Sequence, residues 1–297
     1  MKRIPYALVD VFAPAPGAGN RVAVVLDARG MSPEEMQAVA QSLGAAEAAF
    51  LLERTGAALS VRFFAPGGEV EFSGHAAVAV GLTAARTGLV PEGTTRLYLH
   101  TPTEVLPVEL VLEAGEPRKA WVRGPAPRFR DLPPYRALRE VLEALGSDER
   151  YLHRGLPYGV AFTGLWSLFV PLLAPGVVDA LEPEMERLKA LCFRLDGATV
   201  HAYAPMGPRS FYARDFAPLL GIPEDPVTGS ANAALGALLA RAGVVPRREG
   251  KVLLTVYQGH HLGNPGVVEV QVEYSPTGEP YSVQIGGEAV IVQTGEV

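Results

Sequence analysis

The sequence is poor in residue types whose absence limits what the protein can do. It has one cysteine, Cys192, among its 297 residues. A single cysteine cannot form a disulfide framework within the chain or support a mechanism that needs two thiols. Lysine and arginine number 26 against 32 aspartate and glutamate residues, which gives a net charge of −6. Without a basic excess to neutralise phosphates, the composition argues against nucleic-acid binding.

Several common catalytic and targeting motifs are also missing. The glycines at 17–19 lack the third glycine of a dinucleotide fingerprint, and they precede an expected strand rather than a helix. Neither a P-loop nor a Gly-x-Ser-x-Gly elbow occurs, and the six histidines show no metal-ligand spacing. We therefore expect no nucleotide and no metal. The chain start has no apolar signal-peptide core, which favours a cytoplasmic location.

Residues 155–178 carry no charge and are long enough to span a bilayer. They contain three prolines and four glycines, a density that breaks helices. We expect two short buried strands there, Gly159–Phe162 and Ser167–Leu173, and no membrane span. With 48% hydrophobic and 20% charged residues, the composition is that of a soluble globular protein of about two domains.

Strand patterns outnumber helical patterns along the rest of the chain. The further expected strands are Tyr6–Phe12, Val22–Leu26, Ala49–Leu52, Leu59–Phe64, Thr95–Leu99, Val105–Leu112, Ala120–Arg123, Val252–Gln258, Val267–Tyr274 and Ala289–Gln293. The clearest helix has Ser32 as N-cap, Pro33 at its first position and Glu35 at the third, and it ends at Gly44. Shorter helices are expected near 138–145 and 184–191. The mixture predicts an α+β fold.

A motif of the form Arg-x-Phe-Ala-Pro, spacer, Ser/Thr-Gly-x-Ala occurs twice. It covers residues 62–76 and 214–231, about half a chain apart. Each copy leads into a helix made almost entirely of small and apolar residues, 76–86 and 231–242. A helix that is apolar all round is buried. The repeat therefore predicts two similar domains, each with a sheet wrapped around one central helix, and a boundary near 115–124.

The starts of these two helices are candidate anion sites. A helix N-terminus presents unpaired N–H groups and a partial positive charge, so it binds carboxylates. Gly74 and Gly229 would let a ligand approach the backbone closely. If a pseudo-two-fold axis relates the domains, both helix starts could face one cleft. The alternative is that Ser73 and Thr228 only cap their helices.

Three residues are candidates for acid/base chemistry. His75 stands in the first turn of its apolar helix, where it is either a core histidine or a residue that passes protons near neutral pH. Glu47 lies among apolar residues, either as an outward-facing edge residue or as a buried general acid/base. Asp225 precedes the second helix, where it forms a turn or cap, orients His75, or binds a substrate amine.

Together these motifs resemble those of the phenazine-biosynthesis PhzF-like family, in the family's order and over nearly the whole chain. The most specific block is Glu224-Asp225-Pro226-Val227-Thr228-Gly229-Ser230-Ala231. The other matching segments are Asp10-Val11-Phe12, Gly19-Asn20-Arg21-Val22-Ala23-Val24-Val25, Met36-Gln37 with Ala40, Glu47-Ala48-Ala49-Phe50, Phe63-Phe64-Ala65-Pro66 with Glu69, Phe72-Ser73-Gly74-His75-Ala76 and Gly286-Gly287-Glu288-Ala289-Val290.

The resemblance implies the diaminopimelate epimerase-like fold, with two similar domains, each a mixed or antiparallel sheet around a central helix, and an active site between them. It also implies that the C-terminal strand returns to the first domain. We therefore expect domains at 1–118 with 279–297 and at 119–278. The family's reaction is a cofactor-free isomerisation of trans-2,3-dihydro-3-hydroxyanthranilate by a proton shift. Its members are commonly homodimers, so we expect a homodimer.

The matching motifs also imply residue roles. Glu47 would be the acid/base that moves the proton, while His75 and Asp225 would bind and polarise the substrate. Gly229 and Ser230 would bind the carboxylate of the substrate. The full set of residues expected to contact the substrate is Asn20, Ser73, Gly74, Thr228, Gly229 and Ser230. The related epimerases have a cysteine where Ser73 and Thr228 stand, and alcohols are far weaker acids than thiols, so two-thiol racemisation is not expected.

Some positions depart from the family pattern. Ala46, Ala48 and Ala77 replace hydroxyl residues that the family often has, Arg21 replaces a proline, and Asn264 replaces a basic residue. These changes remove hydrogen-bonding groups around the site and leave the acid/base in place. We predict an isomerase that shifts a proton on a small, cyclic, carboxylate-bearing substrate. The alternatives are an amino-acid epimerase or racemase and a non-enzymatic binding protein on the same scaffold.

Overall fold

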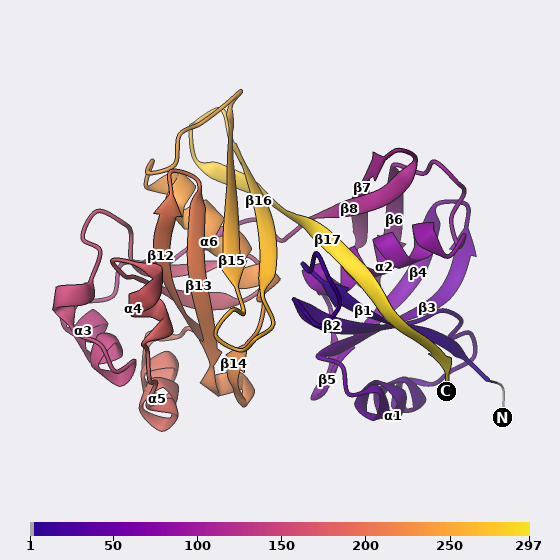
Figure 1. Cartoon of the computed structure of the whole chain (residues 1–297), viewed down its shortest axis with the longest axis horizontal. Coiled ribbons are helices and arrows are strands. Elements are labelled where there is room, and N and C mark those ends of the chain that lie inside the picture. Colours follow the sequence, from indigo (N-terminus) through magenta and orange to yellow (C-terminus); the bar gives the residue numbers. More distant parts are fainter. Residues whose placement is uncertain (1–2) are drawn as a thin grey trace. The chain divides into compact units, whose positions relative to one another are not determined.

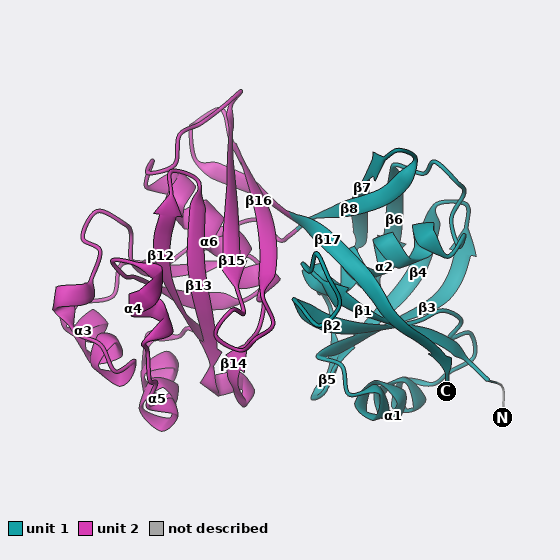
Figure 2. Cartoon of the chain, viewed as in Figure 1, with its two compact units in different colours: residues 1–123, 286–297 teal, residues 124–285 magenta. Residues whose placement is uncertain are grey.

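The computed structural model describes residues 3–297. They form two compact units (Figure 2): residues 3–123 with 286–297 make unit 1, and residues 124–285 make unit 2. The elements, labelled in Figure 1, are β1 Pro5–Val11, β2 Asn20–Val25, α1 Pro33–Leu43, β3 Glu47–Thr55, β4 Ala58–Ala65, β5 Gly68–Val70, α2 Gly74–Arg86, β6 Arg96–His100, β7 Val105–Glu113, β8 Glu116–Arg123, β9 Arg128–Phe129, α3 Tyr135–Ala144, β10 Gly159–Phe162, β11 Trp166–Pro171, α4 Pro175–Asp179, α5 Met185–Leu195, β12 Thr199–Gly207, β13 Ser210–Ala217, β14 Ile222–Asp225, α6 Gly229–Arg241, β15 Lys251–Gln258, β16 Gly266–Tyr274 and β17 Pro280–Glu296. Short 3₁₀ turns lie at Glu149–Tyr151 and Pro218–Leu220.

The strands of unit 1 close into a ring. β1 pairs antiparallel with β2 and with β17, and β2 runs parallel to β3. β3 pairs antiparallel with β4, which is parallel to β6, and β6, β7 and β8 follow as an antiparallel meander. β8 then pairs with β17, which returns the sheet to its first strand. This closure removes the exposed sheet edges that would otherwise need protection.

Helix α2 fills the inside of this ring. It contacts β1, β2, β3, β7 and β8, and its residues from Ala76 to Ala84 are all buried. Small side chains allow the strands to approach closely: a Cβ added at Gly81 would lie only 2.8 Å from a methyl carbon of Val108. The sequence prediction of a central, fully buried helix is confirmed for this unit. Ser73 caps the helix through an Oγ that accepts from the Ala76 N–H.

Unit 2 repeats the same order of strand pairings. β10 is antiparallel to β11, β11 is parallel to β12, and β12 is antiparallel to β13. β13 pairs with β14 and runs parallel to β15, which is antiparallel to β16. Helix α6, as long as α2, is buried from Ala231 to Ala240 against β10, β11, β15 and β16. The internal repeat of the sequence thus has a counterpart in strand order and in the central helix.

Each unit also carries helices outside its sheet. In unit 1, α1 packs against β3, β4 and β5 through buried Met36 and Ala40. Its predicted capping box is confirmed: Ser32 Oγ accepts from the Glu35 N–H, and Glu35 Oε2 accepts from the Ser32 N–H. The helix ends at Gly44, whose φ of 62° is the left-handed conformation that glycine favours. In unit 2, α3, α4 and α5 cover β12 and β13 in a second apolar cluster.

The sequence did not predict β12 and β13, although they form the centre of unit 2. Both are buried on their two faces, so they lack the alternation of polar and apolar residues that marks a half-exposed strand. Their buried faces also contain polar residues, including His201, Arg214 and Asp215. In contrast, the expected strands in the uncharged stretch are confirmed as β10 and β11, the second ending at Pro171 instead of Leu173.

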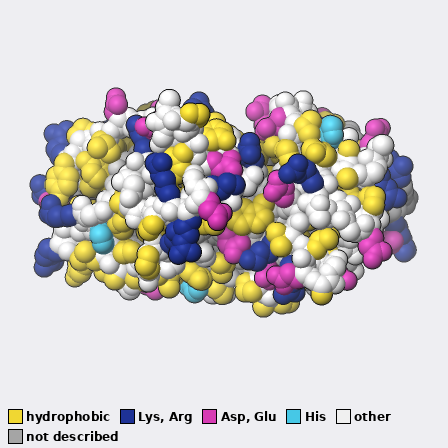
Figure 3. Space-filling view, turned by 90° about the horizontal axis from the view of Figure 1, so that it is seen from above, with side chains coloured by type: hydrophobic (Ala, Val, Ile, Leu, Met, Phe, Trp, Pro, Cys, Tyr) yellow, Lys and Arg dark blue, Asp and Glu magenta, His cyan; other side chains and the backbone are white. Residues whose placement is uncertain are grey.

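No helix within residues 3–297 is long and apolar enough to cross a membrane. On the face that Figure 3 shows, lysine and arginine side chains lie among aspartate and glutamate side chains on each unit. Surface ion pairs include Arg96–Glu109 and Arg187–Glu143, each at 2.7 Å. Exposed pairs of this kind contribute little to stability individually.

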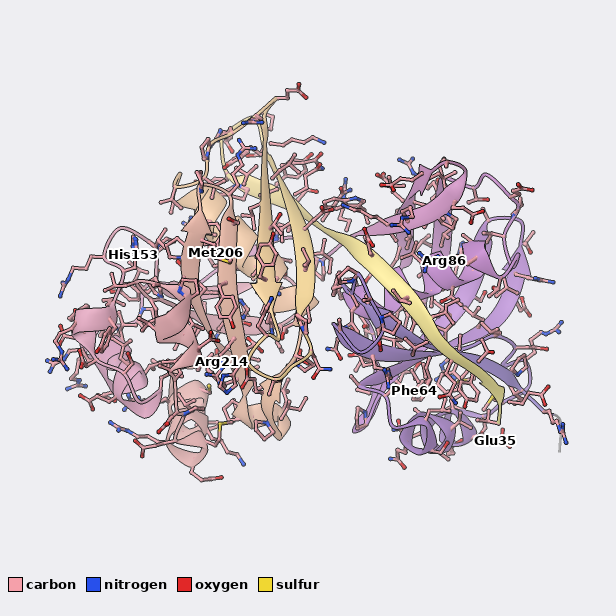
Figure 4. The ribbon with its side chains drawn as sticks, viewed as in Figure 1. Glu35, Phe64, Arg86, His153, Met206 and Arg214 are labelled. Atoms are coloured by element: carbon pink, nitrogen blue, oxygen red, sulfur yellow. The ribbon has the colours of Figure 1, made fainter. Side chains whose placement is uncertain are left out.

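Arg86, at the end of α2 (Figure 4), links the two strands that close the ring of unit 1. Its Nε and Nη2 donate to the Pro117 carbonyl on β8 at 3.1 and 2.9 Å, and its Nη1 donates to the Ala289 carbonyl on β17. These two strands are the pair that closes the ring. Burial lowers the pKa of Arg86 from its ordinary value, since the guanidinium is partly desolvated.

We expect Arg86→Met to lower the free energy of unfolding by about 1–3 kcal/mol, because methionine keeps the aliphatic stem but leaves both carbonyls without their donor. Urea denaturation measures the change. The matched control is Arg96→Met in the same unit, where an exposed ion pair is lost and the change should stay below about 1 kcal/mol. Equal effects of the two substitutions would contradict a fastening role for Arg86.

Candidate active site

Glu47 is the first residue of β3, and the turn after α1 places it. The Ala46 N–H donates to the Arg21 carbonyl at 3.0 Å, and Glu47 then pairs in parallel register with Val22 of β2. The side chain is 19% exposed, and its Oε2 is buried with no hydrogen-bond partner among the described residues. Glu47 is therefore partly buried, between the two alternatives that the sequence left open.

His75 is the second residue of α2, two residues after the cap residue Ser73. Its Nδ1 lies 3.5 Å from Ser73 Oγ, and its Nε2 lies 3.7 Å from Glu47 Oε2. The ring is 15% exposed, and Nε2, like Glu47 Oε2, is buried without a hydrogen-bond partner in residues 3–297. The structure thus brings an acid and a base together, with the facing atoms just beyond hydrogen-bond distance.

Asn20 begins β2, and a constrained loop leads to it. Gly19 has a φ of +66°, and a Cβ added there would lie 2.1 Å from the Val11 carbonyl oxygen, so the chain must pass very close to β1. Asp10 holds this loop by accepting from the Gly17 N–H and from the guanidinium of Arg21. Asn20 itself is 3% exposed. The predicted binding residue is therefore a buried one, on the strand next to β3.

The second cluster of predicted residues lies in unit 2, at the start of α6. Asp225 ends β14, and its Oδ2 accepts from Thr228 Oγ1 at 2.6 Å. Thr228 stands at the N-cap position, but its hydroxyl does not cap the helix. The alternative that Thr228 only caps its helix is therefore wrong, because the hydroxyl donates to Asp225 and accepts from Gln258 Nε2 at 3.1 Å.

Gly229 and Ser230 are the first two residues of α6. The Ser230 carbonyl accepts from Thr163 Oγ1 at 2.7 Å, which ties this turn to the loop after β10. Within the described residues, the N–H groups of Gly229, Ser230 and Ala231 have no hydrogen-bond acceptor, whereas at α2 the N–H of Ala76, which matches Ala231, donates to Ser73 Oγ. The two helix starts therefore differ in how much of their anion-binding capacity they keep.

The repeat allows residues of the two units to be matched. The phenylalanine of the Arg-x-Phe-Ala-Pro motif pairs with residue 48 in unit 1 and with residue 200 in unit 2. The residue before that partner is Glu47 in unit 1 and Thr199 in unit 2. In the helices, His75 matches Ser230. Unit 2 thus has hydroxyl residues where unit 1 has its acid/base pair.

Sequence reasoning missed two features of the clusters. The first is a pair of equivalent bidentate ion pairs. Arg62 binds Glu69 and joins β4 to β5, and Arg214 binds Glu224 and joins β13 to β14. The repeated arginine was a signal for them, but the two glutamates lie at different spacings. The other feature is Gln258, which is 30 residues from Thr228 and belongs to no motif.

Cys192 lies on α5 with 1% of its surface exposed. Burial, and the charge of Asp215, raise the pKa of its thiol to about 12.

No group of three or more histidine, cysteine, aspartate or glutamate side chains within residues 3–297 is arranged to hold a metal ion.

Cys192 should resist alkylation in the folded protein. With a thiol pKa of about 12, only about one molecule in ten thousand carries a thiolate at pH 8. We expect iodoacetamide to add one mass increment to the protein in concentrated urea, where the thiol regains its ordinary pKa, and none in the same time to the folded protein. Equally fast labelling of both would contradict the burial of this residue.

Comparison with known proteins identifies the family to which the chain is similar. A family model described as "Phenazine biosynthesis-like protein" (PhzC-PhzF) matches residues 9–295. An "Uncharacterized isomerase" of Deinococcus radiodurans is 46% identical over 292 residues, 98% of this chain and 93% of that protein. A "Trans-2,3-dihydro-3-hydroxyanthranilate isomerase" of Pseudomonas fluorescens is 30% identical and covers 98% of each chain.

Solved structures give the same assignment of the fold. The Bacillus anthracis phenazine biosynthesis protein of the PhzF family aligns with a TM-score of 0.89, with 30% identity over 100% of this chain and 99% of that chain. A hydroxyproline epimerase from Agrobacterium vitis aligns with a TM-score of 0.67 at 12% identity, over 99% and 92% of the two chains. The second likeness extends to the fold alone, which is the predicted α+β, epimerase-like one.

Proposed function

Since the chain belongs to the phenazine biosynthesis-like (PhzF) family and is an isomerase, we propose that it shifts a proton within a small, cyclic, carboxylate-bearing substrate without a cofactor. The observation that supports this most is the Glu47–His75 pair. The facing atoms lie 3.7 Å apart, and neither has a hydrogen-bond partner in the described residues. Groups that carry protons and are not engaged by the protein itself are suited to general acid/base catalysis.

In this proposal Glu47 is the group that moves the proton. Its carboxylate takes a proton from one carbon of the substrate, and the resulting carboxylic acid returns a proton to another carbon. The double bonds of the substrate shift accordingly, so atoms and charge balance and Glu47 ends in its starting state. His75 Nε2 binds and polarises the substrate next to the carbon that loses the proton.

The unit 2 cluster supplies the binding groups. The N–H groups at the start of α6 bind the substrate carboxylate through Gly229 and Ser230. Asp225, whose Oδ2 accepts from the Thr228 hydroxyl, binds a substrate amine or hydroxyl. The two-thiol route of the related epimerases finds no support, because the one thiol, Cys192, is buried on α5.

Glu47→Gln should abolish most proton exchange. We expect wild-type protein in deuterated water to introduce deuterium into one compound from a panel of cyclic amino and hydroxy carboxylates that includes trans-2,3-dihydro-3-hydroxyanthranilate. The rate, followed by proton NMR, should fall about 10²–10⁴-fold in Glu47→Gln, since a general acid/base contributes that much.

The matched control for this experiment is Glu53→Gln, an exposed carboxylate on the same strand. It should leave the exchange rate unchanged. Full activity in Glu47→Gln would rule out the proposed role of Glu47. Exchange with inversion at the α-carbon of an amino acid would instead identify an epimerase. Absence of exchange with every compound, together with tight binding of one, would favour a binding protein.

The α6 start should bind a carboxylate more strongly than the α2 start. In ¹⁵N-labelled protein titrated with anthranilate, we expect the amide signals of Gly229, Ser230 and Ala231 to shift, because these N–H groups have no acceptor within residues 3–297. The Ala76 amide, already bonded to Ser73 Oγ, should shift little. Larger shifts at α2 than at α6 would contradict the proposed division of roles.

A further inference from the structure

Gln258, the last residue of β15, is completely buried beside the start of α6. Its Nε2 donates to the Asp225 carbonyl at 2.9 Å and to Thr228 Oγ1 at 3.1 Å. Its Oε1 accepts from the Thr228 N–H at 3.1 Å and from Asn232 Nδ2 at 2.7 Å. A glutamine side chain has two N–H donors and an oxygen with two lone pairs, so all of its hydrogen-bonding capacity is used.

These bonds fix which way the amide faces. The Thr228 backbone N–H can only donate, so the glutamine oxygen must lie on that side and the NH₂ group on the other. The NH₂ group then donates to the Thr228 hydroxyl oxygen, and the single hydroxyl proton is free to point to Asp225 Oδ2, 2.6 Å away. The direction of the Thr228–Asp225 hydrogen bond therefore follows from the orientation of Gln258.

The α2 start shows what happens to a cap residue without such a partner. Ser73 occupies the same position as Thr228, and its Oγ accepts from the Ala76 N–H of its own helix. Thr228 makes no such bond. Because its hydroxyl is engaged by Gln258 and Asp225, the first N–H groups of α6 keep their capacity for an external anion.

The backbone after Gln258 is held equally closely. Gly259 has a φ of +87°, and a Cβ added there would lie 2.2 Å from the Asn264 carbonyl oxygen and 2.7 Å from the Pro226 carbonyl oxygen. Only glycine fits between these two carbonyls. The end of β15 is thus locked against the Asp225–Pro226 segment, so Gln258 cannot move away from it without displacing the backbone.

We propose that Gln258 is a positioning residue: it holds the Thr228 hydroxyl on Asp225, and by doing so it both orients the Asp225 carboxylate and keeps the α6 N-terminus open for a substrate carboxylate. This inference rests on the proposed function for the roles of Asp225 and α6. It adds a residue outside every sequence motif, and it explains why one repeat caps its helix while the other does not.

Crystal structures of the wild type, Gln258→Met and Gln258→Glu test the proposal without a substrate. Methionine removes all four bonds, while glutamate keeps the shape and the acceptors but cannot donate to Thr228. In both variants we expect Thr228 Oγ1 to leave Asp225, in Gln258→Met turning to accept from an N–H of α6 as Ser73 does. The control is Gln271→Met in the same unit, which loses a bond to Gln284 and should leave Thr228 in place.

Kinetics give a second, independent readout. Residues that support functional groups typically cost about 10–100-fold in activity when changed. We expect the loss in Gln258→Met and Gln258→Glu to appear mainly as a higher KM, because binding groups are displaced, with kcat less affected. A merely structural role would reduce the fraction of folded enzyme and so lower kcat at constant KM, and it would appear as a lower melting temperature.

The outcomes separate the two proposals. Unchanged Thr228–Asp225 geometry in both Gln258 variants, or a wild-type KM in an active variant, overturns the role of Gln258 whatever the reaction is. If the wild type exchanges no proton in any compound, the proposed function fails, and the crystal structures alone decide whether Gln258 positions Thr228. A released Thr228 hydroxyl with a raised KM supports both.

Discussion

The fold depends on burying a helix on all sides. A helix made of alanine, valine, leucine and glycine has no face for water, so a sheet must surround it, and in unit 1 the strands do so by closing into a ring. Such a helix can meet polar groups only at its ends. Its first N–H groups lack intrahelical partners, and whatever satisfies them stands at the mouth of the ring. Predicted functional residues lie at this end of the buried helix in both units, beside Ser73 in unit 1 and beside Thr228 in unit 2.

The starts of the two buried helices differ in chemistry, although the strands of the two units pair in the same order. The Arg62–Glu69 and Arg214–Glu224 ion pairs join equivalent strands of the two units, ahead of each buried helix in the sequence. Arg214 is 3% exposed and also donates to three carbonyls around the end of α4, which a surface arginine would not do. The chemistry differs: unit 1 has a carboxylate and an imidazole, and unit 2 has hydroxyls, an aspartate and an open helix start.

Much of this could be predicted from the sequence, because it depends on local patterns. The Ser32 capping box, the two apolar helices and the repeat involve residues that are close along the chain. The strands β12 and β13 could not be predicted, since burial on both faces removes the alternation that identifies a strand. Nor could the partner of the Thr228 hydroxyl be predicted. A hydroxyl at an N-cap has several possible partners, and Gln258 is brought to it only by the pairing of β13 with β15.

The surroundings of Asp225 show how the sheet accommodates a buried acid next to a half-buried one. Asp215 on β13 pairs directly with Asp225 on β14, and His201 on β12 pairs with Asp215 on the other side. Like charges directly opposite on neighbouring strands repel. Here each carboxylate has its own donor. Asp215 Oδ1 lies 2.9 Å from His201 Nδ1, in a pair with no exposed surface, whereas Asp225 Oδ2 accepts from Thr228. At the equivalent place in unit 1, Phe63 pairs with an alanine and a valine, so that row needs no compensation. The polar row of unit 2 is therefore replaced by apolar residues at the matched positions of unit 1, and it pairs with the aspartate to which we assign substrate binding.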